Sequence, residues 1–285
     1  MRYMILRKAD ADTEAGAKAS TELLEAMGSY MAPLVEQGVM QAGFGLHPSA
    51  GGKRVAIVDG KAASVTDGPF TESKELVAGI SVYELPSREA ALAALLPWPA
   101  VDGGGNVRLE LREAGCPGGC AEVASDAQGP GKRFCILLRS SALTEGEDIP
   151  PRAALDALDA FNAAQVQAGV LLAGEGLQPS ARGARVKFSG GKPTVLDGPF
   201  AETKELIAGY WMVRVAAIED AIKFACRIPY PIGPRVDVEI RQVYEMEELL
   251  DELTPAEQRT DQLLRFEQLD AGMREQLAAP RPNWH

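Results

Sequence analysis

Apolar residues recur along this chain in two patterns, one typical of strands and one typical of amphipathic helices. Apolar runs at 3–6 and 134–138 have the length of buried strands. After each run, apolar side chains at spacings of three and four predict a helix, at about 23–35 and about 155–168. The chain therefore starts the same way twice.

The segments that follow also correspond between the two halves. Gly38 and Gly169 stand where a residue of positive φ commonly ends a helix. Pro97 and Pro229 end a second pair of helices, because proline cannot continue the helical hydrogen bonds. In the order strand, hairpin, strand, helix, strand, we expect elements at 39–44, 55–61, 80–85, 89–96 and 107–112, and again at 170–173, around 190–192, 210–215, 219–228 and 236–241.

This order predicts an α+β fold of ferredoxin-like (split βαβ) units, each with an added hairpin. The strands at 107–112 and 236–241 alternate strictly, so we expect them to be half-buried. Two helices cover one face of such a sheet and leave the other face apolar. We therefore predict that the two units pack sheet to sheet as an internal pseudo-dimer.

An internal repeat supports this duplication. Residues 67–79 and 197–209 are identical at ten of thirteen positions, at a constant offset of 130. The predicted domains are a first unit at 1–112, a linker rich in glycine and proline at 113–131, a second unit at 132–245 and an acidic helical extension at 246–285. The extension either packs on the body of the protein or contacts a partner protein.

Composition narrows the possible functions. The formal net charge is −11, whereas nucleic-acid binders normally carry a basic surplus, so we expect no nucleic-acid partner. No apolar stretch is long enough to cross a bilayer, and no secretion signal follows the basic start, so we expect a cytoplasmic protein that does not bind membranes.

Four cysteines in a chain of this length do not form a disulfide framework. Cys116 and Cys120 form one local pair, which suits either a reversible disulfide or half of a metal site. A second ligand pair is missing from the sequence, so we predict neither a metal nor a cofactor.

The motif Asp-Gly-Pro-Phe, present at 67–70 and 197–200 and followed by Glu-Ser-Lys-Glu and Glu-Thr-Lys-Glu, resembles that of the YCII-related, or DGPF-domain, family. The resemblance covers about residues 1–112 and 132–247 and implies a ferredoxin-like fold that pairs into an α/β barrel. It also implies a genomic association with sigma factors in bacteria, which makes a sigma factor or other regulatory protein a possible partner. Some members of the family resemble enzymes with a His–Asp pair whose histidine lies in the first helix. Neither predicted first helix contains a histidine here.

The repeated motif supplies the first candidate site residues. Asp67 and Asp197 either act in a cleft, as general bases or as partners of a ligand cation, or are turn residues whose carboxylates accept backbone N–H groups. Lys74 with Glu75, and Lys204 with Glu205, either hold an anionic ligand or form surface ion pairs. Phe70 and Phe200 either stack on a ligand or fill the core.

Four other positions complete the candidates. Trp98 and Tyr230, each flanked by prolines, line a pocket or pack beneath a loop. His47 is either a lone base or ligand or an ordinary surface histidine, and Gln178 replaces it in the second unit, so a role for the histidine would belong to one site.

We expect the protein to bind an unknown small molecule in a pocket between the two stacked sheets, in a stress or signalling context. The first alternative is an enzyme of hydrolase or isomerase type that uses Asp67 or Asp197 as its base. The second alternative is a protein-interaction module that acts through its C-terminal helix.

Overall fold

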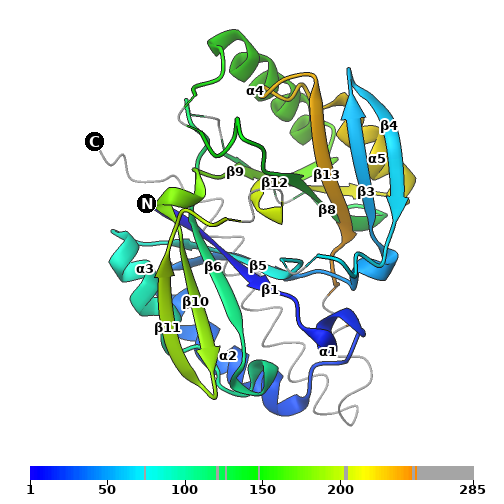
Figure 1. The fold of residues 1–285 in the computed structure, drawn as a ribbon. Coiled ribbons are helices and arrows are strands. Elements are labelled where there is room, and N and C mark those ends of the chain that lie inside the picture. Colours follow the sequence, from blue (N-terminus) through cyan, green and yellow to red (C-terminus); the bar gives the residue numbers. More distant parts are fainter. Residues whose placement is uncertain are drawn as a thin grey trace.

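The computed structural model describes residues 1–73, 75–119, 122–125, 127–146, 148–201, 205–245 and 248 (Figure 1). Lys74, Cys120 and Lys204 lie outside the described residues. So does the predicted C-terminal helical extension, apart from Glu248.

Each unit contributes four strands and a hairpin. The first unit and the linker contain β1 Arg2–Lys8, α1 Ala11–Glu14, α2 Thr21–Glu36, β2 Met40–Gly45, η1 Ser49–Gly51, β3 Lys53–Val58, β4 Lys61–Asp67, β5 Val77–Glu84, α3 Arg88–Leu95, η2 Asp102–Gly105, β6 Arg108–Glu113 and β7 Val123–Ala124. The second unit contains β8 Lys132–Arg139, α4 Arg152–Gln167, β9 Leu171–Gly176, η3 Ser180–Arg182, β10 Ala184–Ser189, β11 Lys192–Asp197, β12 Ile207–Val215, α5 Ile218–Arg227 and β13 Arg235–Gln242.

Local chemistry sets several of these boundaries. The hydroxyl of Ser20 accepts a hydrogen bond from the Leu23 N–H and so caps α2. Gly38 and Gly169, directly after the C-caps of α2 and α4, have φ of 68° and 69°. Asp59 and Gly60, in the turn of the predicted hairpin at 55–61, both have positive φ, which is typical of a type I′ turn.

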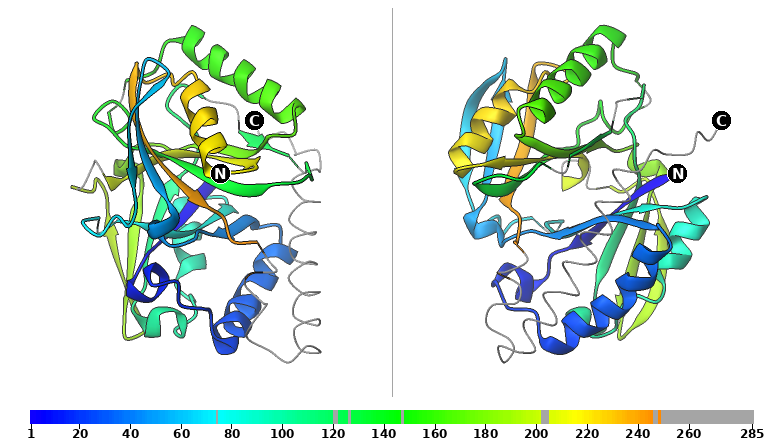
Figure 2. Two further views of the ribbon diagram at one scale, coloured as in Figure 1. Left: turned by 90° about the vertical axis from the view of Figure 1, so that its right-hand side faces the viewer. Right: turned by 180° about the vertical axis from the view of Figure 1, so that it is seen from behind.

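The strands form two antiparallel sheets. One has six strands in the order β11-β10-β6-β1-β5-β2, and the other has seven in the order β4-β3-β13-β8-β12-β9-β7. Helices α2 and α3 lie outside the first sheet and α4 and α5 outside the second, so the sheets face each other (Figure 2). The mixed α+β class is confirmed. The predicted barrel is not, because each sheet ends in edge strands among the described residues.

The two units exchange their hairpins. Strands β3 and β4 of the first unit join β13 of the second, while β10 and β11 of the second unit join β6 of the first (Figure 1). The sequence pattern had indicated a hairpin within each unit but not this destination.

Chain connectivity explains the exchange. Strand β2 lies at the edge of its sheet, three strands away from β6. Directly after β2, Leu46 pairs with Val243 of the second unit, and the His47 N–H donates to the Gln242 carbonyl oxygen at 2.9 Å. The second unit repeats this contact through Leu177 and Ala114. Each hairpin therefore begins beside the end of the other unit's last strand and pairs with that strand.

An apolar cluster fills the centre of the interface between the sheets, which we call the seam. It contains Met4 and Leu6 of β1 together with Leu137 of β8 and Tyr210 and Met212 of β12, all of them buried. Because both units contribute side chains, each sheet covers the apolar inner face of the other.

The Gly-Pro-Phe turn packs tightly against the 3-10 helix that precedes each hairpin. A Cβ atom at Gly68 would overlap the carbonyl oxygen of Ser49, and one at Gly198 would overlap that of Ser180. The Phe70 N–H donates to the Ser49 hydroxyl at 3.1 Å, and the Phe200 N–H donates to the Ser180 hydroxyl at 3.3 Å. Only glycine fits at the second position of the motif.

We predict that Gly68→Ala lowers the free energy of unfolding by about 3 kcal/mol, near the upper end of the cost of overpacking, because the backbone at Ser49 must move. Gly28→Ala is the control, because Gly28 lies in α2 and a Cβ atom there would meet nothing within 4 Å. Alanine favours helices, so the control should be neutral or stabilising by up to about 1 kcal/mol. Denaturant unfolding of both variants measures the difference, and equal midpoints would refute the assignment.

Candidate functional site

Charged side chains flank the apolar centre of the seam. The pairing of Met4 with Arg112 and of Leu6 with Glu110 places Glu110 and Arg112 on the face of β6 that meets the other sheet. Arg185 on the exchanged hairpin pairs with Glu110 in register and shares that face. The expectation that the strand at 107–112 is half-buried is therefore wrong, because its charged face is covered by the second sheet.

The first charged cluster centres on Glu110, which is completely buried. Its carboxylate lies 3.0 Å from Lys8 Nζ, 3.1 Å from Arg112 Nη1 and 3.3 Å from Arg185 Nε. Burial alone would raise the pKa of Glu110, but these cations lower it to about 2. Glu75, also buried, lies 2.9 Å from Arg185 and 3.3 Å from Lys8.

The second unit repeats this cluster around Glu239. Arg54 of the other exchanged hairpin lies 2.9 Å from the Glu239 carboxylate, Arg241 lies 3.0 Å away and Arg139 3.5 Å away. Glu205 faces this cluster and accepts a hydrogen bond from the Ser73 hydroxyl at 3.3 Å. Each cluster therefore combines a carboxylate from one unit with a hairpin arginine from the other.

The phenylalanine of each repeated motif supports the hairpin arginine. The guanidinium carbon of Arg54 lies 4.1 Å from the centre of the Phe70 ring, and that of Arg185 lies 4.1 Å from the centre of the Phe200 ring. Both rings are buried. The motif thus places an aromatic face under the cation that enters the seam, an arrangement that stabilises both groups.

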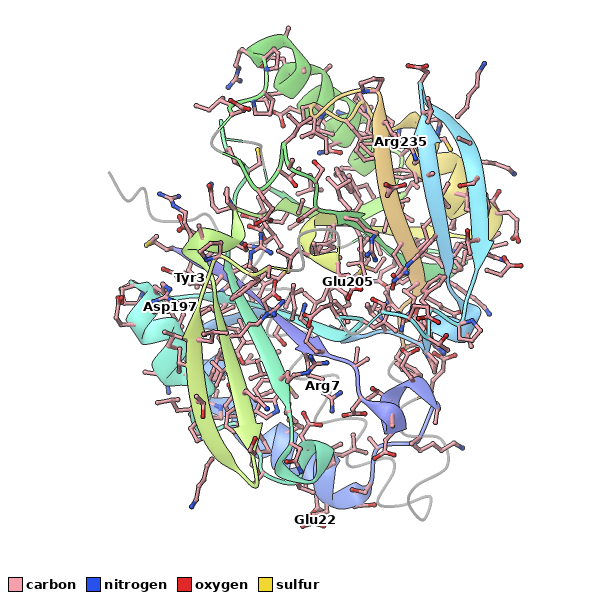
Figure 3. All side chains as sticks on the ribbon, viewed as in Figure 1. Tyr3, Arg7, Glu22, Asp197, Glu205 and Arg235 are labelled. Atoms are coloured by element: carbon pink, nitrogen blue, oxygen red, sulfur yellow. The ribbon has the colours of Figure 1, made fainter. Side chains whose placement is uncertain are left out.

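Asp67 and Asp197 lie away from the seam. Their side chains are 75% and 72% exposed, and each pairs with one cation, Lys53 at 2.6 Å and Arg88 respectively. Figure 3 shows Asp197 at the end of β11 that lies away from the hairpin turn, whereas Glu205 lies between the sheets. Neither aspartate lines the described pocket, so the geometry gives a general base no enclosed site.

Most of the other candidate residues from the sequence contact neighbouring residues of the protein. The Trp98 indole N–H donates to Asp102 at 2.8 Å, and the ring is buried. His47 stacks on Tyr244 with ring centres 3.9 Å apart and lies 3.2 Å from Glu248. The main-chain carbonyl oxygen of Gln178 accepts a hydrogen bond from Arg112 at 2.7 Å. Tyr230 packs edge to face on Trp211.

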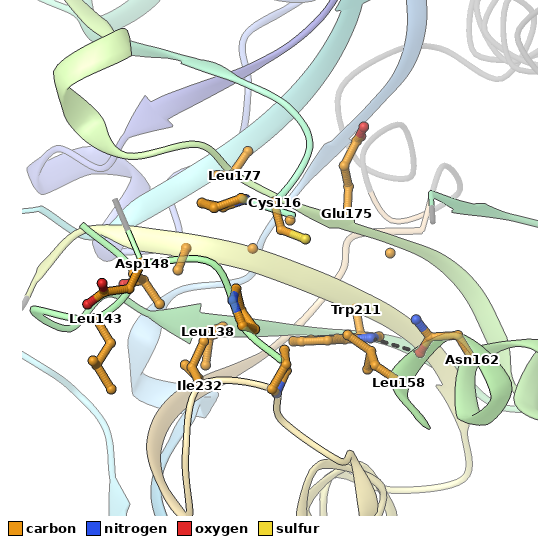
Figure 4. Close-up of a pocket in the computed structure, with 18 residues that line it drawn as sticks. Cys116, Leu138, Leu143, Asp148, Leu158, Asn162, Glu175, Leu177, Trp211 and Ile232 are labelled. Atoms are coloured by element: carbon orange, nitrogen blue, oxygen red, sulfur yellow. Dashed lines mark hydrogen bonds between the residues drawn. The ribbon is translucent and has the colours of Figure 1, made fainter. Parts of the chain in front are cut away.

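A pocket of about 70 Å³ opens on the helix-covered face of the seven-stranded sheet (Figure 4). Leu138, Leu158 and Trp211 belong to the core beneath α4 and α5 and form its apolar wall. Cys116 and Pro117 of the linker lie on the opposite side. Cys116 is disulfide-bonded, whereas Cys135 and Cys226 are free thiols.

One polar group inside the pocket is fixed in orientation. The Trp211 indole N–H can only donate, and it donates to Asn162 Oδ1 at 3.2 Å. The Asn162 amide nitrogen therefore points away from the indole and has no hydrogen-bond partner among the described residues. Asn162 is buried and lines the pocket, so this nitrogen is available to a hydrogen-bond acceptor of a ligand.

The equivalent region of the first unit has different chemistry. Arg7 pairs with Gly79 in register as Leu138 pairs with Gly209, so Arg7 takes the place of Leu138. It lies 2.6 Å from Asp102 and 2.7 Å from Asp10. Ser81 takes the place of Trp211 by the same registers. A charged trio thus stands in the first unit where the second has an apolar pocket.

The model of the YCII-related domain matches residues 1–113 and 133–247. The chain belongs to the YCII-related domain family. The two matches correspond to the two units, so the YCII-related domain is present here as a tandem repeat within one chain.

A curated relative extends this comparison. An uncharacterised protein of Rhizobium meliloti (strain 1021) is 38% identical over 68 residues, which are 24% of this chain and 55% of that protein. The chain thus matches about half the length of this relative. The similarity supports membership of the YCII-related family and identifies no reaction.

Two features of the described residues concern membrane and metal binding. No helix of the described residues is long and apolar enough to cross a membrane. Within the same part of the chain, no group of three or more His, Cys, Asp or Glu side chains is arranged to hold a metal ion.

Two features were not predicted from the sequence: the arginines of the charged clusters, and the pocket beside Trp211. The signal for the clusters was present, because Arg54, Glu110 and Arg112 recur as Arg185, Glu239 and Arg241 at offsets of 129 to 131. A charge repeated at one strand position in both copies indicates a shared contact. The pocket had no such signal, since Asn162 and Trp211 occur in one copy only.

We predict that Glu110→Gln lowers the free energy of unfolding by about 3 kcal/mol at neutral pH, because it leaves buried cations unpaired. The lowered pKa of Glu110 stabilises the fold above its unfolded value of about 4.5, and this contribution is lost as the pH falls towards 2. The difference between wild type and variant should therefore shrink between pH 5 and pH 2, as measured by denaturant unfolding. The exposed Glu25→Gln serves as the control, and a difference that stays constant with pH would contradict the assignment.

Proposed function

We propose that this YCII-related protein binds a small, largely apolar molecule in the pocket beside Trp211. The observation that supports the proposal is a partly enclosed apolar wall with one oriented donor, the amide nitrogen of Asn162. Ligand sites commonly combine apolar walls with a few fixed polar groups.

The size of the pocket supports a ligand larger than water. Its volume of about 70 Å³ exceeds several-fold the roughly 10–15 Å³ that a single water needs. Leu138 and Leu158 would contact the apolar body of a ligand, and Asn162 would donate to a carbonyl or hydroxyl oxygen. The pocket lies between the sheet and α4 rather than between the two sheets, where we had placed it from the sequence.

Binding is a better proposal than catalysis for the described residues. The two aspartates offered as general bases are exposed and paired with cations. The buried carboxylate of Glu110 is surrounded by cations, which lower its pKa and leave a weak base. The buried carboxylate of Glu239 is paired with Arg54 and Arg241. A reaction would need an activated group, and the pocket supplies an amide and an indole instead.

We predict that Ala208→Leu abolishes binding of 3-phenylpropanamide, a probe with an apolar body and a carbonyl acceptor. Ala208 lines the pocket, and the larger side chain would occupy it. Isothermal titration calorimetry of the wild type should give a measurable dissociation constant in the micromolar to millimolar range, and the variant should give no heat of binding.

The matched control is Ala78→Leu, the same change at the equivalent position of the first unit. Ala78 does not line the pocket, so this variant should bind like the wild type. Ligand-induced changes in Trp fluorescence should disappear in Trp211→Phe. Equal binding by the Ala208 and Ala78 variants would place the ligand elsewhere and refute the proposal.

A further inference from the structure

The described lining of the pocket includes two acidic residues, Asp148 and Glu175, and no lysine, arginine or histidine. The side chain of Glu175 lies on the other face of the sheet, because Glu175 pairs in register with Tyr210 of the seam. The chain as a whole adds to this potential with a net charge of −11. A negative potential raises the local concentration of cations and repels anions.

The two carboxylates differ in availability. Glu175 is buried and accepts two hydrogen bonds from Arg2, both at 2.9 Å, so its charge is balanced by the first unit. Asp148 lies in the loop between β8 and α4, is exposed, and makes no ion pair with a described residue. Asp148 is therefore the carboxylate that can pair with a ligand at the pocket mouth.

The interior of the pocket disfavours an anion. An anionic ligand would meet Asp148 at the mouth and would find no counter-charge among the described residues inside. Desolvating a carboxylate without a partner is costly, so the pocket disfavours organic acids.

We propose that the ligand of this pocket is a small organic amine, with an apolar body against Leu138, Leu158 and Trp211 and its protonated nitrogen at Asp148. This assignment rests on the proposed function and names the class of molecule that the site takes. It concerns the second unit alone, because Arg7 with its two aspartates stands at the equivalent place in the first unit.

Three probes with one phenylethyl body test the assignment: phenethylamine, 3-phenylpropanamide and 3-phenylpropanoate. Titration calorimetry of the full chain at low salt should show the amine binding at least tenfold more tightly than the carboxylate. Asp148→Asn should weaken binding of the amine about two- to fivefold, the range of an exposed ion pair, and leave binding of the amide unchanged. Added salt should weaken binding of the amine alone.

Asp156→Asn is the matched control. Asp156 is an exposed aspartate on α4 that pairs with Arg152 and does not line the pocket, so its loss changes the net charge equally. This variant should bind the amine like the wild type.

The outcomes separate the two proposals. If the amide and the amine bind equally and Asp148→Asn changes neither, the amine assignment falls while the pocket remains a binding site. If the carboxylate binds most tightly, the amine assignment is again overturned. If none of the three probes binds at millimolar concentration, both the amine assignment and the proposed function fall.

Discussion

The structure depends on the contact between an arginine on each exchanged hairpin and a buried glutamate of the other unit. Arg185 reaches Glu110, and Arg54 reaches Glu239. Each glutamate is buried by the opposing sheet, and a buried carboxylate is tolerated only where cations pair with it. Each hairpin also buries apolar side chains in the core of the other unit, Val55 and Ile57 in one and Val186 and Phe188 in the other. The core beneath each pair of helices therefore contains side chains of both units.

This constraint explains the repeated motif. Glycine allows the turn to close on the 3-10 helix before the hairpin, and phenylalanine supports the arginine that enters the seam. The aspartate stands at the exposed end of the hairpin, where it pairs with a nearby cation. The motif is explained by how it positions the hairpin, and its aspartate lies in the solvent rather than in an enclosed site.

The sequence predicted the elements well and their partners poorly. Periodicity located α2, α4 and the opening strands because burial on one face leaves a local pattern, and the duplication was visible at a fixed offset. Hairpin exchange leaves no such pattern, since a strand reads the same beside either neighbour. The alternation at 107–112 likewise predicted one solvent-exposed face, because the sequence of a strand whose charged side chains pair with the other unit is the same as that of a strand whose charged side chains face water. The short elements α1 and β7 gave no periodic signal at all.

Covalent duplication accounts for a contrast between the two units of this chain. Their residues at the seam are similar, whereas their residues on the outer faces differ. In a pair of identical subunits every substitution would occur twice, whereas each half of this chain can change alone. The cluster positions are nearly the same in both halves because the two hairpins meet the same geometric requirement. Positions outside the seam are free of it, so Arg7 and Ser81 correspond to Leu138 and Trp211. One unit fills this region with a charged trio, and the other keeps an apolar wall with an oriented amide. The seam therefore fixes the shape of the molecule, and the asymmetry outside it is where a binding function has room to evolve.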